Sequence, residues 1–354
     1  MCVMCACISK NKPVITTLLE AGIRMEGLWS GYYTGLGVLG DDRLIRSFKT
    51  TGWSKYWQER FHTDELQGTM GMFHSRTGSG GDARYAHPFL SNDQSTLLCS
   101  QGSAGHFKNN IADIEKIGNH LLDSGIHFAS ADWQVPIRKY PMLKDGSQVH
   151  VSDIVCEYAA QLFRDSGDAL GSIRQTALDI LEEAVSLFIF RERPGHIYIA
   201  NLNQRICIHF HEDGVILSTS SLAIADKQMH VLELPPNSVS DVTLDNIFIE
   251  KLSSEIIVDT SIPAGLDHAF ISWVKKHPKS LLAHITDNAL APFFPSMPIT
   301  MRGATAYRVF ERLYYQGILK IEMLEAAGVG NDHSIRTLIS IANDHSKESE
   351  NSLQ

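Results

Sequence analysis

The sequence predicts an α+β protein in which sheets and helices form separate layers. Short apolar or alternating runs typical of strands fall into two groups, at 1–8, 35–38, 70–74 and 95–99, and at 184–191, 197–201, 207–211, 215–218 and 231–234. Between the two groups, helical spacing dominates at 109–123, 152–164 and 170–181. Strands and helices that come in separate runs, without strict alternation, are typical of α+β architectures.

Local signals support the individual elements. Residues 1–8 form an apolar run that ends at a polar tetrapeptide, as expected of a buried first strand. Residues 14–26 repeat apolar side chains at helical spacing, and Ser152 with Asp153 is a typical N-terminal cap for the helix that follows. Two further elements are predicted in this part: a helix with connector at 43–66 and a strand at 127–130.

The character of the sequence changes after about residue 250. Helical spacing predicts an appended helical domain over residues 251–345, with helices at 266–276, 279–288, 304–316, 318–327 and near 334–343. The last residues, 346–354, are polar and predict a disordered tail. The predicted organisation is therefore a first domain over 1–250, a helical domain of unknown role over 251–345 and a short tail.

Composition excludes several classes of protein. A net charge of −9 argues against a nucleic-acid-binding surface, which normally carries a basic excess. No apolar run is long enough to cross a bilayer, and no secretory leader is apparent, so we expect a cytoplasmic protein without membrane contact. The six cysteines are expected to be free thiols in a reducing compartment, and no metal site is expected.

The first two residues, Met1 and Cys2, suggest a nucleophile. Removal of an initiator Met before a small residue would leave Cys2 with a free α-amine next to its thiol. An N-terminal amine with a pKa of about 8 can serve as the base for its own side chain, and the thiolate is the attacking form of cysteine. Position alone is a weak signal, because any protein can have Cys at this position.

Several further motifs follow Cys2 in a particular order. Gly31-Tyr32-Tyr33-Thr34-Gly35 comes first, followed by His74-Ser75-Arg76-Thr77, Tyr85-Ala86-His87-Pro88-Phe89 and Ser100-Gln101-Gly102. In this order they resemble the class II glutamine amidotransferases, which are N-terminal-nucleophile (Ntn) glutaminases. The resemblance covers about residues 2–250 and is strongest to the glutaminase half of glutamine–fructose-6-phosphate transaminase. It implies an Ntn-hydrolase αββα sandwich, two antiparallel sheets between helical layers.

The resemblance also implies roles for individual residues. Cys2 would attack the side-chain amide of glutamine, while Gln101 and Gly102 would occupy the positions that bind the oxyanion. Arg76 would bind the substrate α-carboxylate, with Thr77 beside it where the family has Trp. The family's Asp for the substrate α-ammonium corresponds either to Asp132 or to Asp153, which sits directly at a helix start.

Three functions remain open at this stage. The first is a glutaminase that releases ammonia to an acceptor, either a partner protein or a molecule bound by the helical domain. The second is an amide hydrolase with a different substrate, since Gln101 replaces the family's oxyanion Asn and Thr77 its Trp. The third is a non-catalytic binding or regulatory module. No cofactor is expected, and a homo-oligomer is possible.

Overall fold

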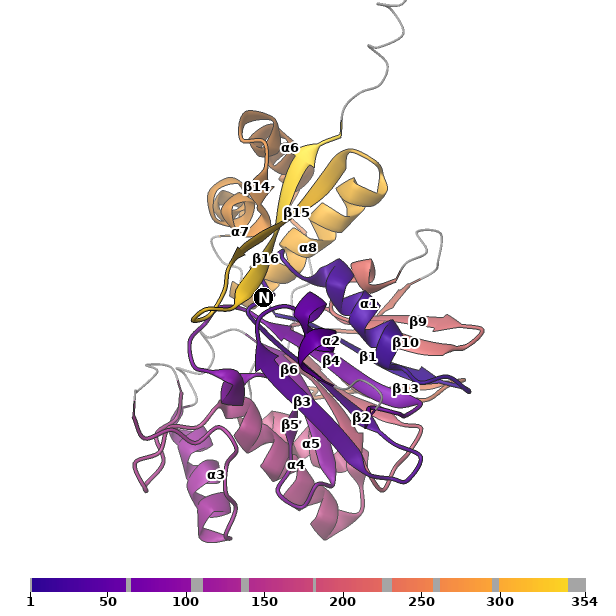
Figure 1. Ribbon diagram of the computed structural model, residues 1–354, viewed down its shortest axis with the longest axis vertical. Coiled ribbons are helices and arrows are strands. Elements are labelled where there is room, and N and C mark those ends of the chain that lie inside the picture. The colour runs from indigo at the N-terminus through magenta and orange to yellow at the C-terminus, as the bar shows by residue number, and fades with distance from the viewer. Residues whose placement is uncertain are drawn as a thin grey trace, which may run out of the picture.

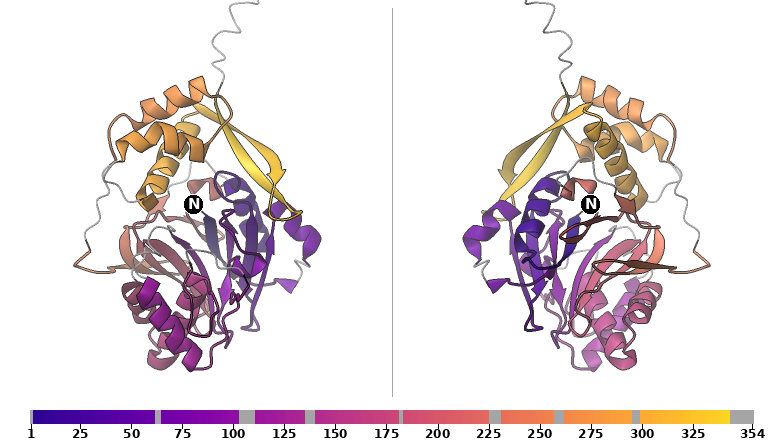
Figure 2. Two further views of the ribbon diagram at one scale, coloured as in Figure 1. Left: turned by 90° about the vertical axis from the view of Figure 1, so that its left-hand side faces the viewer. Right: turned by 90° about the vertical axis from the view of Figure 1, so that its right-hand side faces the viewer.

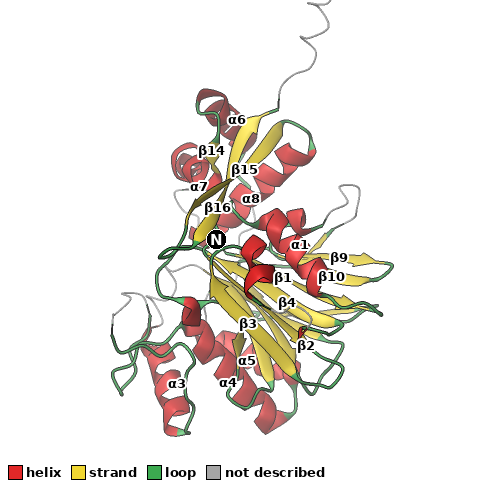
Figure 3. Cartoon of the chain, viewed as in Figure 1, coloured by secondary structure: helices red, strands yellow, loops and turns green. Residues whose placement is uncertain are grey.

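Two antiparallel sheets lie face to face in the computed structural model, and helices cover the outer face of each (Figure 1). The structure describes residues 2–61, 65–102, 111–134, 140–180, 183–224, 231–256, 262–294 and 299–342. Figure 3 shows the same layers by type of secondary structure, with yellow strands in the middle of the sandwich. This is the αββα arrangement of Ntn hydrolases that the resemblance implied, so the predicted fold class is confirmed.

One sheet has seven strands, and its centre is β1. In sheet order they are β11 (Leu232–Glu233), β9 (Cys207–His211), β10 (Gly214–Ser218), β1 (Val3–Ser9), β4 (Met70–Arg76), β2 (Tyr33–Leu39) and β3 (Ile45–Thr51). Helix α1 (Ile15–Met25) packs on the outer face of this sheet, against β1 and β4. The first strand and the helix that follows it are therefore as predicted.

The other sheet has six strands. In sheet order they are β13 (Ile247–Lys251), β12 (Asn237–Val242), β8 (Ile197–Leu202), β7 (Ala184–Phe190), β6 (Thr96–Gly102) and β5 (Phe89–Leu90). Its outer face is covered by α4 (Val151–Ser166) and α5 (Ala169–Ile180), and α3 (Ile111–Asp123) packs against α4. Apolar side chains from both sheets, such as Met72, Leu97 and Ile199, fill the space between them.

The C-terminal region corrects one of the predictions. Residues 319–327 and 333–341, predicted as helices, are the strands β15 (Leu319–Ala327) and β16 (His333–Ile341) of a three-stranded antiparallel sheet that is completed by β14 (Ser280–Leu281). The appended region is therefore not a purely helical domain. Pairing along the whole length of β15 and β16 overrides the helical propensity of the Leu, Glu, Met and Ala residues in β15.

Helices complete the C-terminal region. They are α6 (Leu266–Lys276), α7 (Leu282–Ile285), which continues as a π-helical turn over Thr286–Leu290, a 3₁₀ turn at Ala291–Phe293, and α8 (Ile299–Tyr315). Their buried side chains join the core that also contains α1, so this region packs against one end of the sandwich (Figure 2). The proposed limits of the domains remain a prediction, and the predicted tail at 346–354 lies outside the described residues.

Three smaller differences concern the sandwich. Residues 45–51, predicted as part of a helix and connector, form β3, and only Trp57–Arg60 of that stretch is α-helical (α2). Residues 127–130 form a turn where a strand was predicted, and β12 and β13 were not predicted. Within the described part of the chain, no helix is long and apolar enough to cross a membrane.

Candidate active site

Strand alternation directs the key side chains into one end of the space between the sheets. Alternate residues of β1, β4 and β6 fill the inter-sheet core, and these are Met4, Ala6, Ile8, Met70, Met72, Leu97 and Cys99. Because side chains alternate between the two faces of a strand, the same alternation places Cys2, His74, Arg76 and Gln101 on that inner face. The pairing of Met4 with His74 further implies that Cys2 lies opposite Arg76.

The pKa of the Cys2 thiol is lower than that of an ordinary cysteine. Burial raises its pKa, but the neighbouring imidazole of His74, the charge of the chain's amino terminus and the backbone N–H of Thr77 together lower it to about 6. The Nε2 atom of His74 lies 3.1 Å from the carbonyl oxygen of Ser100 and must donate to it, since a carbonyl only accepts. The other ring nitrogen, Nδ1, is buried and has no hydrogen-bond partner among the described residues, so it is the nitrogen available to the thiol. At pH 7 the thiolate would be the major form of Cys2.

Neighbouring cysteines of the same strand behave differently. Cys5 and Cys7 are buried on the opposite face of β1, in the core beneath α1. Burial raises the pKa of Cys7 to about 12 and that of Cys5 further still. Both are inert core residues, so β1 carries one activated thiol and two structural ones.

Arg76 is held in a fixed position at the end of β4. The side chain is 2% exposed, its Nη1 donates to the carbonyl of Gly80 at 2.9 Å, and its Nη2 donates to the hydroxyl of Tyr140 at 2.5 Å. Its guanidinium also lies over the ring of Tyr33, with 4.8 Å between Cζ and the ring centroid. A guanidinium oriented in this way is suited to binding a carboxylate, because less side-chain freedom is lost on binding.

The predicted oxyanion residues lie at the end of β6. The side chain of Gln101 is buried, and its Nε2 donates to Oε1 of Gln204 at 3.3 Å. Gly102 is the last residue of the strand, is exposed and pairs with Ala184 of β7. Residues 103–110, which follow them, lie outside the described part of the chain. Gln101 is thus at the correct end of the sandwich, but one of its two amide N–H groups already has a partner.

The two candidate aspartates have different surroundings. Asp132 forms an ion pair with Arg84 at 2.9 Å. Asp153, in the first turn of α4, is fully buried and accepts hydrogen bonds from the N–H and hydroxyl of Ser130, both at 2.8 Å, through Oδ2. Burial raises its pKa, and Oδ1 has no partner among the described residues. No hydrogen bond or ion pair in the described part of the chain joins either carboxylate to Cys2 or Arg76, so the choice between them stays open.

Other residues of the site were not predicted. The role of His74 was missed although its motif was identified, because a histidine two residues before an Arg gives no sign of which group it faces. Tyr140 lies outside the predicted helices and strands, and nothing in the sequence indicates its contact with Arg76. Tyr307 of α8 comes from more than 300 residues away, and its charge interaction with Cys2 arises only from the packing of the C-terminal region.

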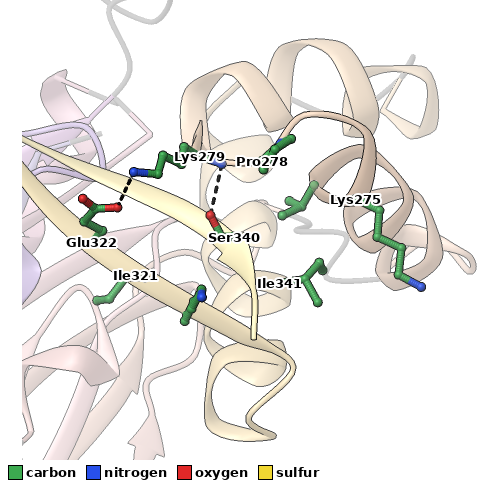
Figure 4. Close-up of a pocket in the computed structure, with 9 residues that line it drawn as sticks. Lys275, Pro278, Lys279, Ile321, Glu322, Ser340 and Ile341 are labelled. Carbon is green, nitrogen blue, oxygen red and sulfur yellow. Dashed lines mark hydrogen bonds and ion pairs between the residues drawn. The ribbon is translucent and has the colours of Figure 1, made fainter. Parts of the chain in front are cut away.

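A cavity of about 660 Å³ lies away from these residues, in the C-terminal region (Figure 4). It is lined by residues of α6, β15 and β16, and Lys279 closes one side through an ion pair with Glu322 at 2.9 Å. The backbone N–H of Lys279 also donates to the hydroxyl of Ser340 at 3.1 Å. None of the predicted site residues lines this cavity, so it is separate from the candidate active site.

Comparison with known proteins agrees with the resemblance to glutamine amidotransferases. The chain is 23% identical over 299 residues to a glutamine–fructose-6-phosphate aminotransferase (isomerizing) of Methanothermobacter thermautotrophicus, covering 81% of this chain and 46% of that protein. The chain thus spans about half the length of this curated relative. No family model matches the sequence.

Solved structures agree in fold. The chain superimposes over its full length on a glutamine phosphoribosylpyrophosphate amidotransferase from B. subtilis, with a TM-score of 0.57, 11% identity and 71% of that chain covered. A structure described as the allosteric regulatory enzyme of purine biosynthesis gives a TM-score of 0.54, 14% identity and 70% coverage. The protein resembles the class II glutamine amidotransferases and has their Ntn-hydrolase fold.

Proposed function

We propose that this protein is a glutaminase of the class II amidotransferase type, with Cys2 as the nucleophile. The observation that carries the proposal is the position of Cys2 at the end of the central strand, opposite the fixed Arg76. The lowered pKa of its thiol supports it. Thiolates with depressed pKa values at partly accessible positions are typical of catalytic cysteines. The similarity to glutamine-dependent enzymes supports glutamine as the substrate.

The proposed reaction proceeds through a thioester. The thiolate of Cys2 adds to the side-chain carbonyl carbon of glutamine, a C–S bond forms, and the carbonyl electron pair moves to oxygen. Collapse of this intermediate breaks the C–N bond, and the nitrogen leaves as ammonia after taking a proton from the protonated α-amine of Cys2, which removal of Met1 would free and which becomes neutral in this step. Water then hydrolyses the glutamyl thioester and releases glutamate.

The remaining predicted residues would bind the substrate. Arg76, with Thr77 next to it, would hold the α-carboxylate of glutamine, and either Asp153 or Asp132 would accept the α-ammonium. Gln101 and Gly102 are the candidates inherited from the family for the oxyanion. Ammonia would pass to an acceptor on a partner protein or to one bound near the C-terminal region.

Replacement of Cys2 by Ala tests the proposal directly. Glutamate release from glutamine should fall by a factor on the order of 10⁴ or more, because the nucleophile is lost. Cys7→Ala is the matched control: it removes a thiol from the same strand, on its other face, and should leave kcat unchanged. Hydrolysis of other amides but not of glutamine would instead indicate a different substrate, and equal glutamate release by wild type and Cys2→Ala would refute the proposal.

A further inference from the structure

Buried polar contacts of helix α8 hold it against the end of the sandwich where Cys2 lies. Glu311, 3% exposed, accepts hydrogen bonds from the hydroxyl of Ser220 at 2.7 Å and from that of Ser221, and it forms an ion pair with Arg205 at 2.7 Å. A buried carboxylate with a charged partner and two hydroxyl donors is a fixed anchor point. The position of α8 along this end of the sandwich is therefore well defined.

The anchor lies next to the beginning of β1. Thr219, which precedes the two serines, donates its N–H to the carbonyl of Met4 at 3.1 Å, and the N–H of Met4 donates to the Thr219 hydroxyl at 3.1 Å. Met4 is two residues from Cys2. In Figures 1 and 2 the start of the chain accordingly lies where the C-terminal region meets the sandwich.

Tyr307 lies one helical turn before Glu311, on the same face of α8. Residues four apart on a helix are neighbours about 5–6 Å from each other, so Tyr307 also faces this end of the sandwich. Its ring packs on that of Trp29, with 5.3 Å between centroids, and the side chain is 1% exposed. Its hydroxyl has no hydrogen-bond partner among the described residues. A buried hydroxyl without a partner is destabilising, so its presence calls for a reason.

The proposed reaction at Cys2 needs a buried hydrogen-bond donor of this kind. The tetrahedral intermediate of amide hydrolysis carries an oxyanion that needs hydrogen-bond donors. The amide of Gln101 donates to Gln204, whose own amide donates to the carbonyl of Glu183 at 3.3 Å. This chain of contacts directs Gln101 toward Gln204. One N–H of Gln101 is therefore used in this contact, and a donor from another element would add to the N–H that remains.

We propose that the hydroxyl of Tyr307 is an oxyanion donor of the Cys2 site, contributed by the C-terminal region. This assignment rests on the proposed glutaminase function. As Cys2 attacks and the carbonyl electron pair moves to oxygen, the Tyr307 O–H donates a hydrogen bond to that oxygen without transferring its proton. When the intermediate collapses, the electron pair returns and the hydrogen bond is released. The C-terminal region thereby completes the active site.

The electrostatics of Tyr307 agree with this role. Burial raises the pKa of Tyr307, and the charges of Glu311 and Cys2 raise it further. The hydroxyl therefore keeps its proton at neutral pH and can donate a hydrogen bond.

Tyr307→Phe tests the assignment, since it removes the hydroxyl and keeps the ring on Trp29. Glutaminase kcat should fall about 10²–10³-fold with little change in KM, as expected for one lost oxyanion donor. The affinity for the aldehyde analogue of glutamine, which adds to Cys2 as a tetrahedral adduct, should fall by a similar factor. The rate of Cys2 alkylation by iodoacetamide should stay at the wild-type value, and the melting temperature should not fall, because the hydroxyl that is removed has no hydrogen-bond partner among the described residues. A purely structural role would not combine this with a loss of kcat.

Two comparison variants keep the test decisive. Tyr315→Phe removes another hydroxyl from α8, one that lies near Ser221, and should leave kcat unchanged. Gln101→Leu should reduce kcat by less than about 10-fold if Tyr307 is the principal donor. If the wild type is active and kcat of Tyr307→Phe is unchanged, or if only Gln101→Leu shows a large loss of kcat, the assignment of Tyr307 is overturned while the proposed function stands. A wild type without glutaminase activity would overturn the proposed function and the assignment with it.

Discussion

The sandwich and the C-terminal region meet at the start of β1, yet they are stabilised differently. The central strands of the sandwich are buried on both faces, as in β1, β2 and β4. By contrast, most side chains of β15 are exposed, and the C-terminal region shares its apolar core with α1 of the sandwich. We infer that the sandwich can maintain the position of Cys2 by itself, whereas the C-terminal region depends on its docking contacts.

The buried ion pair should give the largest effect on stability. Glu311→Leu leaves the Arg205 guanidinium buried with Glu233 as its remaining partner, so we expect a loss of about 3 kcal/mol in the free energy of unfolding. Denaturant titration measures it. The double variant Arg205→Met/Glu311→Leu should recover part of the loss because no charge is left unpaired. A single variant as stable as wild type would show that this anchor does not hold α8.

A glycine contact between the two regions should have the next largest effect on stability. Gly27 has φ +89°, and a Cβ there would lie 2.5 Å from Oγ1 and 2.8 Å from the backbone nitrogen of Thr337 in β16. Gly27→Ala should therefore cost about 2–3 kcal/mol, from backbone strain and the clash together. Gly317→Ala is the control, since Gly317 has φ +73° but open space around it, and should cost only about 1 kcal/mol. Equal losses in the two variants would mean that β16 does not rest on Gly27.

The activation of Cys2 should depend on the sandwich through His74. Since the pKa of the thiol is lowered to about 6, alkylation by iodoacetamide should increase with pH and reach half its maximum near pH 6. His74→Asn removes the imidazole, so the midpoint should move upward by more than one pH unit, toward the ordinary value of about 8.5. Measuring the alkylation rate between pH 4 and 10 gives both midpoints. An unchanged midpoint would exclude His74 as the cause.

An exposed ion pair between the two regions should have the smallest effect on stability. Lys55 and Glu325 form an ion pair at 3.1 Å with side chains 56% and 41% exposed. Such a pair is largely screened by water, so Lys55→Ala should not change the denaturation midpoint measurably. A clear destabilisation would show that surface charges contribute to docking as well as the buried contacts.

The fold of the sandwich could largely be predicted because its strands are apolar runs separated by polar turns, as in 1–8 and 70–74. The C-terminal sheet could not, because β15 is rich in strong helix formers and becomes a strand only through its pairing with β16. In the site, the positions of Cys2, Arg76 and Gln101 followed from motif order. Tyr307 could not be predicted because only tertiary packing brings α8 to the end of β1.

The central claim is that Cys2 attacks a glutamine side chain, and covalent labelling tests it most directly. Wild-type protein would be incubated with the glutamine analogue diazo-oxo-norleucine, with excess glutamine as competitor, and its N-terminal peptide analysed by mass spectrometry. The proposed mechanism predicts a peptide without Met1, a single adduct on Cys2 and protection by glutamine. A retained Met1, or labelling at other cysteines with Cys2 unmodified, would contradict it.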